Sequence, residues 1–247
     1  MMDRTAPHST SLPDRAKRSD KKGYDQTRAR VETYFDRTAT KTWERLTSDA
    51  PVSRIRETVR AGRDRMRDLM LSRLPDDLRG ARVLDAGCGP GMVTIELARQ
   101  GATVTAADIS PQLIDIAQLR LPHDLQNQVT FHAGDMLDPK LGQFDAVIAM
   151  DSLIYYTADD IGTSLAALEK RVSGPIIFTV APRTPALMAM WYAGKAFPRS
   201  DRSPVMIPHA HPKLARAAKA QGVRRMLRPV ERVTSGFYIS EAMELRA

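Results

Sequence analysis

The chain has 247 residues, of which 43% are hydrophobic and 27% are charged, and it contains a single cysteine. This composition supplies a core for one α/β domain with extra elements, excludes an intrachain disulfide and fits a reducing compartment. The N-terminus lacks the apolar core of a signal peptide, and no window of about 18 apolar residues follows it. We therefore expect a cytoplasmic protein, with peripheral attachment to a membrane left open.

The net charge of +8 is distributed unevenly along the chain. Residues 1–80 carry 19 basic and 13 acidic side chains, residues 81–182 carry 6 and 12, and residues 183–247 carry 12 and 4. Basic segments therefore flank an acidic central segment. A basic surface often serves only solubility, but this arrangement also fits an anionic substrate, nucleic acid or an acidic membrane surface.

The pattern along the chain predicts three parts. Residues 1–24 are polar, charged and proline-containing, and we expect them to form a disordered tail. Residues 25–52 are expected to form an N-terminal helical arm, because apolar residues recur there at helical spacing. Residues 53–247 are expected to form the main domain, with an insertion or lid at residues 183–211.

The main domain is predicted to open with a helix from Ser53 to Leu74, which ends before Pro75. Ser53 is a favourable N-cap residue, and apolar residues recur on one side of the helix. The other side carries a row of arginines. Solvation is the default interpretation of such a row, and pairing with anionic groups of a substrate is the alternative. The row consists of Arg54, Arg56, Arg60, Arg63, Arg65 and Arg67.

The segment VLDAGCGPGM, from Val83 to Met92, predicts a strand, a tight turn and the start of a helix. Glycine at alternate positions permits positive φ and close approach of the backbone, so that amides face a ligand. Asp85 precedes the turn and would repel a pyrophosphate, which favours a cationic ligand. Cys88 lies inside the turn, where a small side chain packs beneath a cofactor, so a role as a nucleophile is not expected.

Strand-like and helical segments alternate after this turn, which predicts a mostly parallel, doubly wound sheet. Asp108 ends the second strand, at the position that hydrogen-bonds a ribose diol in such sheets. Asp135 ends the third strand and Met150 the fourth. Because parallel strands end at one edge, these residues are expected to share a site. Strands are expected near residues 82–86, 103–108, 128–132, 144–150 and 175–181, and helices near 91–100, 111–119 and 159–171.

The composition changes after Pro182. The segment from Pro185 to Pro198 contains three large aromatic residues and two methionines. It is interpreted either as a helix packed on the sheet or as a lid that covers a large planar ligand, with Trp191 on the substrate. A basic helix near residues 212–221 and strands near residues 223–232 and 236–245 are expected to follow.

The pattern D-x-G-x-G-x-G from Asp85 to Gly91, followed by Asp108 and by the pair Gly134 and Asp135, resembles the class I S-adenosylmethionine-dependent methyltransferases over about residues 53–182. The resemblance implies a Rossmann-like α/β fold with a mostly parallel seven-stranded sheet, helices on both faces and S-adenosyl-L-methionine as cosubstrate. It also implies that Asp85, Gly87, Gly89 and the backbone after Met150 hold the amino-acid end of the cofactor, Asp108 the ribose hydroxyls, Ile109 and Met136 the adenine faces, and Asp135 the adenine amino group.

The chain is also similar to a narrower group, the magnesium-protoporphyrin IX O-methyltransferases of chlorophyll and bacteriochlorophyll biosynthesis. The similarity rests on YFDRTATKTWERL, VSRIRETVRAGRDRMR, VLDAGCGPG and above all FDAVIAMDSLIYY, with FYISEAMELR near the C-terminus. It implies methylation of one propionate of magnesium-protoporphyrin IX to give the monomethyl ester, with magnesium present only in the substrate. It further implies substrate transfer from the porphyrin-binding subunit of magnesium chelatase and peripheral contact with the inner, photosynthetic membrane.

Five residues are candidates for contact with the substrate or the reacting atoms. Tyr34 matches a tyrosine of the family's N-terminal arm and is expected either to close over the sulfonium or to pack on the core. Family members often carry a histidine where this chain has Tyr155, so an imidazole role does not transfer, and its hydroxyl either orients the substrate or packs. His209 and His211 are interpreted either as axial ligands of the porphyrin magnesium or as surface loop histidines. Trp191 belongs to the proposed lid.

Three other functions are alternatives. A nucleic-acid methyltransferase would need a [DN]-P-P-[YF] run after the fourth strand or a cysteine nucleophile, and the sequence has neither. A non-catalytic cofactor-binding regulator is disfavoured by the intact strand-end acids. Another small-molecule O- or N-methyltransferase, for example one acting on a quinone precursor, is the closest alternative.

Overall fold

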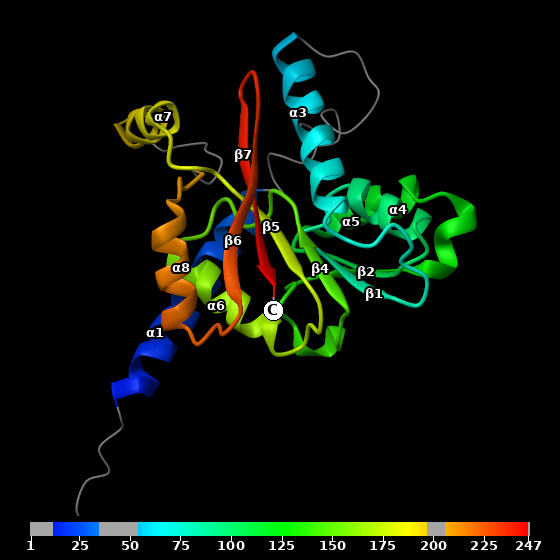
Figure 1. Cartoon of the computed structure of the whole chain (residues 1–247), viewed down its shortest axis with the longest axis horizontal. Coiled ribbons are helices and arrows are strands. Elements are labelled where there is room, and N and C mark those ends of the chain that lie inside the picture. Colours follow the sequence, from blue (N-terminus) through cyan, green and yellow to red (C-terminus); the bar gives the residue numbers. More distant parts are fainter. Residues whose placement is uncertain (1–11, 35–53, 197–205, 247) are drawn as a thin grey trace, which may run out of the picture.

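The computed structural model describes residues 12–34, 54–196 and 206–246, and its centre is a seven-stranded sheet (Figure 1). The strand order is β3-β2-β1-β4-β5-β7-β6, and only β7 runs antiparallel to its neighbours, β5 and β6. The mostly parallel α/β sheet is therefore confirmed. The strands are β1 (Arg82–Ala86), β2 (Thr103–Asp108), β3 (Val129–Ala133), β4 (Ala146–Ala149), β5 (Ile176–Val180), β6 (Met226–Ser235) and β7 (Tyr238–Arg246).

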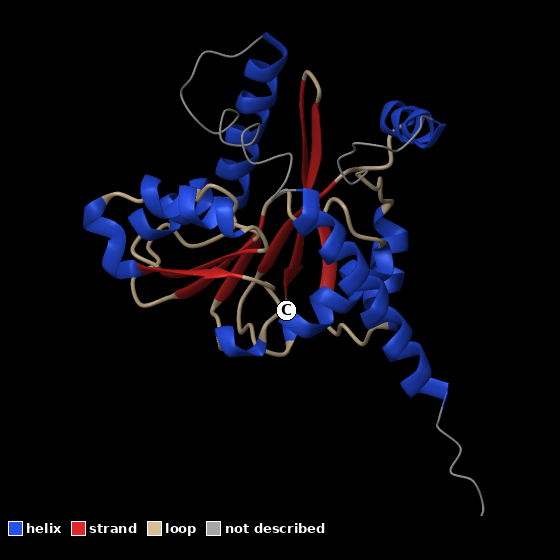
Figure 2. Cartoon of the chain, turned by 180° about the vertical axis from the view of Figure 1, so that it is seen from behind, coloured by secondary structure: helices blue, strands red, loops and turns tan. Residues whose placement is uncertain are grey.

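Helices cover both faces of the sheet, and each face has its own hydrophobic cluster. Successive side chains of a strand point to opposite faces, so Val147 and Ile148 of β4 belong to different clusters. One face is covered by α1 (Leu12–Tyr34), α6 (Ala158–Glu169) and α8 (His211–Ala220), and the other by α3 (Arg54–Leu71), α4 (Met92–Arg99) and part of α5 (Pro111–Arg120). Figure 2 shows the two sets of helices from behind.

The remaining described helices are short or peripheral. Helix α7 (Pro185–Ala196) follows β5 and lies apart from the sheet, near the top of α8 (Figure 1). Short 3-10 segments occur at η2 (His123–Gln128) and η3 (Pro139–Leu141). A search of the described ranges finds no helix with the length and apolar character needed to cross a membrane.

The order in which the chain adds strands to the sheet changes direction between β1 and β4, although the two strands are parallel. From β1 the chain moves outward through β2 to β3, and it then returns to place β4 on the other side of β1. In open α/β sheets, a crevice forms at the carboxyl ends of the strands at such a switch point. The glycine turn after β1 lies at this point.

Helix α3 packs against the long β6–β7 hairpin (Figure 1). Ser235 Oγ donates a 2.8 Å hydrogen bond to the carbonyl oxygen of Thr58, and Arg73 contacts Glu244 at 2.9 Å. A Cβ on Gly62 would lie 2.7 Å from a ring carbon of Tyr238, so the two elements touch closely. This packing fixes which side of α3 faces away from the hairpin.

The N-terminal region differs from the predicted tail and arm. Residues 12–24, expected to be disordered, form the first half of α1, and the helix ends at Tyr34. Tyr24, Thr27 and Val31 are buried, so one side of the second half of the helix is removed from water. The remainder of the predicted arm, from residue 35 to residue 52, lies outside the described residues.

Candidate active site

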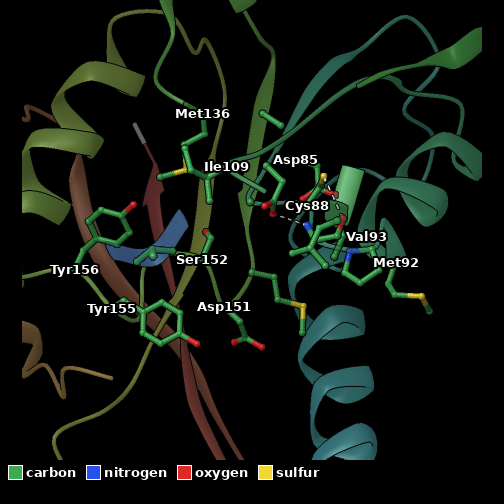
Figure 3. Close-up of a pocket in the computed structure, with 18 of the residues that line it drawn as sticks. Asp85, Cys88, Met92, Val93, Ile109, Met136, Asp151, Ser152, Tyr155 and Tyr156 are labelled. Atoms are coloured by element: carbon green, nitrogen blue, oxygen red, sulfur yellow. Dashed lines mark hydrogen bonds between the residues drawn. The ribbon is translucent and has the colours of Figure 1, made fainter. Parts of the chain in front are cut away.

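A pocket opens at the carboxyl ends of β1, β2 and β4. Helices α1 and α3 contribute to its walls (Figure 3). Nine residues predicted from the sequence line it: Asp85, Gly87, Gly89, Asp108, Ile109, Asp135, Met136, Met150 and Tyr155.

The glycine turn forms the floor of this pocket. Gly87 has a φ of 79°, and a Cβ there would lie 2.3 Å from the Cβ of Ser152, so only glycine fits. Gly89 has a φ of 52°, and a Cβ there would meet no atom within 4 Å, so this part of the turn faces open space. The turn thus combines one tightly packed glycine with one whose backbone is accessible to a ligand.

Asp85 is the most deeply buried acid of the pocket, with 1% of its surface exposed. Its Oδ2 accepts a 2.6 Å hydrogen bond from Thr94 Oγ1. Burial, opposed by this hydrogen bond and reinforced by the nearby charge of Asp108, raises the pKa of Asp85 to about 7. A cation beside Asp85 would restore its charge, so the site favours a positively charged ligand group.

Asp108 ties the end of β2 to the glycine turn. Its Oδ2 accepts a 2.8 Å hydrogen bond from the backbone N–H of Gly89, and its Oδ1 accepts a 2.9 Å bond from that of Ser110. Asp108 is therefore held in a fixed orientation at the pocket wall.

Asp135 is contacted by helix α1. Tyr24 Oη donates to Asp135 Oδ1 at 2.9 Å, and Arg28 Nη1 forms an ion pair with Oδ2 at 2.8 Å. The backbone N–H of Leu137 also donates to Oδ1 at 2.9 Å. Burial is the main cause of a raised pKa of Tyr24, so its phenol stays protonated and remains a donor. The sequence prediction missed Tyr24 and Arg28, because both lie at or near the boundary of the expected tail.

Asp151, two residues after the end of β4, is the centre of a second polar cluster. It has a φ of 54°, unusual for a residue with a side chain, and it lines the pocket. Arg63 of α3 contacts its Oδ2 at 2.6 Å, Tyr238 Oη donates to its Oδ1 at 3.1 Å, and Thr179 Oγ1 accepts from its backbone N–H at 2.7 Å. Three separate elements thus hold this turn, which the sequence indicated only through the run MDSLIYY.

Ser152 presents an unused hydroxyl beside the glycine turn. Its Oγ is buried and has no hydrogen-bond partner among the residues that the structure describes. Figure 3 places Ser152 on the pocket wall between Asp151 and Ile109. Buried polar groups are normally paired, so this hydroxyl is suited to a ligand atom.

Tyr155 and Tyr156 form an apolar wall opposite the glycine turn (Figure 3). Burial raises the pKa of Tyr155, and the neighbouring Tyr34 and Asp151 add to the rise, so Tyr155 is unsuited to act as a base near neutral pH. Tyr156 stacks on Tyr24 with ring centroids 5.3 Å apart. Tyr34 packs against the core cluster and is not among the residues that line the pocket. Its expected contact with a sulfonium remains a prediction.

Four less polar side chains complete the lining at the carboxyl ends of the strands. Ile109, Met136 and Met150 line the pocket, and Met136 and Met150 are each 8% exposed. Cys88 is also buried, and burial raises the pKa of its thiol well above the ordinary value. The thiol therefore stays protonated, in agreement with the expectation that it is no nucleophile.

The pocket also explains part of the arginine row. Arg60, Arg63 and Arg67 line it, so the default interpretation of a solvated face is wrong for these three residues. Arg65 matches that interpretation, because its side chain is 66% exposed. The spacing of the three residues places them on one side of α3, facing away from the hairpin.

Trp191, His209 and His211 lie away from the pocket. Trp191 packs edge-on against Tyr192 on α7 and borders a separate hollow. His209 is 3% exposed, so it is no surface histidine, and its Nε2 lies 3.0 Å from the carbonyl oxygen of Tyr156. His211 Nε2 lies 3.1 Å from the carbonyl oxygen of Leu227. The two imidazoles are used within the fold, and the substrate roles of the three residues remain predictions.

No group of three or more metal-ligating side chains is arranged to hold an ion within the described ranges. The pocket instead combines acids at the strand ends, an accessible glycine backbone and buried apolar walls. This set suits a cationic nucleoside derivative next to a second ligand.

Two family models match the chain. Residues 83–173 match a methyltransferase domain, and residues 149–247 match the magnesium-protoporphyrin IX methyltransferase C-terminus. The first range contains the acidic end of the pocket, and the second begins at the end of β4 and includes Asp151, Tyr155 and Tyr238.

Similar proteins extend this match over most of the chain. Magnesium-protoporphyrin O-methyltransferase of Rhodobacter capsulatus is 62% identical over 90% of this chain and 98% of its own length, and that of Synechocystis sp. is 32% identical over 70% and 76%. The crystal structure of magnesium protoporphyrin IX methyltransferase from Synechocystis PCC 6803 with bound SAH has a TM-score of 0.75 and 28% identity, covering 88% of this chain and 98% of that one. The chain therefore belongs to the magnesium-protoporphyrin IX O-methyltransferase family, with the class I methyltransferase fold that the glycine turn and the strand-end acids indicated.

Proposed function

We propose that this protein transfers a methyl group from S-adenosylmethionine to one propionate carboxylate of magnesium-protoporphyrin IX, in chlorophyll or bacteriochlorophyll biosynthesis. The products are the monomethyl ester and S-adenosylhomocysteine. The observation that carries the proposal is 62% identity to the Rhodobacter capsulatus enzyme over nearly its whole length, together with a pocket that is acidic at the strand ends. The match of residues 149–247 to the porphyrin enzymes disfavours the quinone-precursor alternative.

The residues present fit the cosubstrate. When bound, S-adenosylmethionine supplies a methyl group on a positively charged sulfur. Asp85 would hold the amino-acid ammonium, since a cation beside its buried carboxyl favours the ionised form and lowers its raised pKa. Asp108 would accept hydrogen bonds from the ribose hydroxyls. The open turn at Gly89 leaves room for the ligand to contact the protein backbone.

The adenine would lie between apolar side chains at the end of β2 and after β3. Ile109 and Met136 line the pocket at those points (Figure 3), and Asp135, which precedes Met136 in the chain, also lines it. Asp135 would accept a hydrogen bond from the adenine amino group in addition to the contacts that Tyr24 and Arg28 of α1 make with its two oxygens. The backbone after Met150 would hold the amino-acid end of the cofactor, and Ser152, whose side chain lies beside Gly87, offers a buried hydroxyl to a ligand atom.

The chemistry needs no strong base. A propionic acid resembles a glutamic acid in acidity and is ionised at neutral pH, so the nucleophile is already formed. The protein has to align the two groups and remove water from the carboxylate, and correct alignment alone is worth on the order of 7 kcal/mol or more. Buried Tyr155 and Tyr156 provide the water-excluding wall, and their hydroxyls stay protonated.

A direct assay tests this function. The protein is incubated with S-adenosylmethionine and magnesium-protoporphyrin IX, and mass spectrometry follows the gain of one methyl group and the formation of S-adenosylhomocysteine. The dimethyl ester of the porphyrin serves as a substrate control without a free carboxylate, and Asp108→Ala serves as a protein control with impaired cofactor binding. Absence of turnover of both the magnesium porphyrin and the metal-free porphyrin would refute the proposed function.

We also propose peripheral contact with an anionic membrane surface and transfer of substrate from the porphyrin-binding subunit of magnesium chelatase. The basic flanks of the chain support the first, and the family supports the second. Co-sedimentation with anionic and neutral vesicles tests the membrane contact. A purified chelatase subunit on a sensor surface tests the protein contact, and no binding in either case would remove that part of the proposal.

A further inference from the structure

The charged residues that line the pocket fall into two groups with opposite net charge. At the carboxyl ends of β1, β2 and β3, three carboxylates accompany one guanidinium group. On α3 and at the end of β4, three guanidinium groups accompany two carboxylates. The first group is Asp85, Asp108 and Asp135 with Arg28, and the second, here called the arginine end, is Arg60, Arg63 and Arg67 with Asp64 and Asp151.

The arginine end is held in place by its own ion pairs and by the fold. Arg63 contacts Asp151 at 2.6 Å, with side chains 17% and 6% exposed, and Arg67 contacts Asp64 at 2.8 Å. Arg60 precedes Arg63 by three residues and Arg67 by seven, so all three lie on the same side of α3. This side of the helix faces the pocket because its other side packs on the hairpin.

We propose that the arginine end binds the second, non-reacting propionate of the substrate. The inference rests on the proposed function and adds which residues recognise the dicarboxylate. A carboxylate moved out of water needs a charged partner, and paired guanidinium groups are the preferred one. The reacting carboxylate is the poorer candidate, because a charge-assisted pair with arginine would lower its nucleophilicity.

Within the arginine end, Arg60 provides the main contact, and Arg67, which also pairs with Asp64, provides a weaker one. Arg63 is held by Asp151, the residue that fixes the turn after β4. The positively charged sulfonium of the cofactor and the arginine end would offer two separate positive partners, one for each propionate. The porphyrin is thereby oriented with one propionate toward the cofactor and the other toward α3.

The test combines a substrate change with a protein change. The substrates are magnesium-protoporphyrin IX and an analogue in which the non-reacting propionate is a methylamide. The variants are Arg60→Gln and Arg67→Gln, and the matched control is Arg65→Gln on the exposed side of the same helix, where Arg65 contacts Glu231 at 3.0 Å. Wild type is expected to lose about tenfold or more in kcat/KM on the analogue, the size of a lost charged hydrogen bond.

Arg60→Gln is expected to show a similar loss of kcat/KM on the natural substrate, mainly through a higher KM. On the analogue, its kcat/KM is expected to equal that of wild type on the analogue. Losses that do not add identify a direct contact between the two changed groups. Arg67→Gln behaves in the same way to a smaller extent, and Arg65→Gln behaves as wild type. Calorimetry is expected to give an unchanged affinity for S-adenosylhomocysteine in all three variants.

A second readout does not depend on turnover. Quenching of protein fluorescence by the two porphyrins, with S-adenosylhomocysteine saturating, gives their affinities directly. Equal binding of both porphyrins by wild type, or fully additive losses in Arg60→Gln, would overturn the arginine-end proposal and leave the proposed function intact. Failure of wild type to methylate either porphyrin would instead refute the proposed function, and the binding data would still decide the inference.

Discussion

Asp85→Asn is expected to stabilise the ligand-free protein above neutral pH and to weaken cofactor binding at the same time. Asp85 is buried, and its pKa is raised from the ordinary 3.8 to about 7, mainly by burial. The amide of asparagine has the same size and keeps an oxygen that accepts the hydrogen bond from Thr94. The variant therefore removes the cost of burying a charge without leaving a cavity.

The size of the effect follows from the two pKa values. The folded protein holds the Asp85 proton more tightly than the unfolded chain, so the stability from this residue is fully present below about pH 4 and is lost as the pH rises through about 7. A tenfold difference in proton affinity is worth about 1.4 kcal/mol, so the difference between 3.8 and about 7 amounts to about 4 kcal/mol. Asparagine avoids this loss.

Urea unfolding of both proteins over a range of pH measures the difference. Between about pH 5 and about pH 8, the free energy of unfolding of Asp85→Asn relative to wild type is expected to rise by about 3 kcal/mol. Titrating groups elsewhere contribute equally to both proteins and cancel. A stability difference that stays flat with pH would refute the assignment of the raised pKa to Asp85.

Calorimetry with S-adenosylhomocysteine tests the second half of the prediction. The ligand carries the amino-acid ammonium, so wild type is expected to release a proton on binding near neutral pH, and its affinity is expected to fall below pH 7. Asp85→Asn is expected to bind about tenfold or more weakly at higher pH, because a charged hydrogen bond is lost. Unchanged affinity in the variant would show that Asp85 does not contact the ligand.

Three further results are expected. Gly87→Ala is expected to abolish cofactor binding and to destabilise the fold more than Gly80→Ala. Both glycines have a φ of 79°, but only a Cβ at Gly87 would clash with a neighbour. Denaturation and calorimetry of the two variants therefore separate the effect of the clash from that of the backbone strain. Asp151→Ala is expected to cost about 3 kcal/mol, since the partly buried guanidinium of Arg63 loses this ion pair, and Tyr238→Phe only about 1 kcal/mol. Equal costs in urea unfolding would contradict this. Cys88→Ala is expected to keep its kcat, and a lost kcat at unchanged stability would restore a chemical role for the thiol.

The sequence predicted those site residues whose position follows from the βα repeat. A strand ends where its apolar run ends, and parallel strands bring their carboxyl ends to one edge, so Asp85, Asp108, Asp135 and Met150 were predicted together. The short distance along the chain from each strand to its turn makes this inference local. Residues 82–86 and 103–108 match β1 and β2 without correction.

Residues contributed by the flanking helices could not be predicted in the same way. Tyr24 and Asp135 are 111 positions apart, and their contact depends on how α1 docks rather than on any local pattern. Arg63 and Asp151 are 88 positions apart. The helical period of α3 indicated that the arginines share a side. Which part of the protein that side faces depends on how the hairpin near the C-terminus packs on the helix. Tyr24 nevertheless continues the apolar spacing of Thr27 and Val31, and this signal would have extended the predicted helix toward the N-terminus.

The charge division of the pocket also bears on the direction of the reaction. Before transfer, the acidic group beside Asp85 favours a positive cofactor, and the arginine end favours a dicarboxylate. Methyl transfer turns a sulfonium into a neutral thioether and a carboxylate into a neutral ester, so one positive and one negative charge disappear together. In the proposed arrangement, the ammonium beside Asp85 and the second propionate beside Arg60 keep their charges after transfer. The two reacting groups attract each other as ions before transfer, and this attraction is absent between the thioether and the ester.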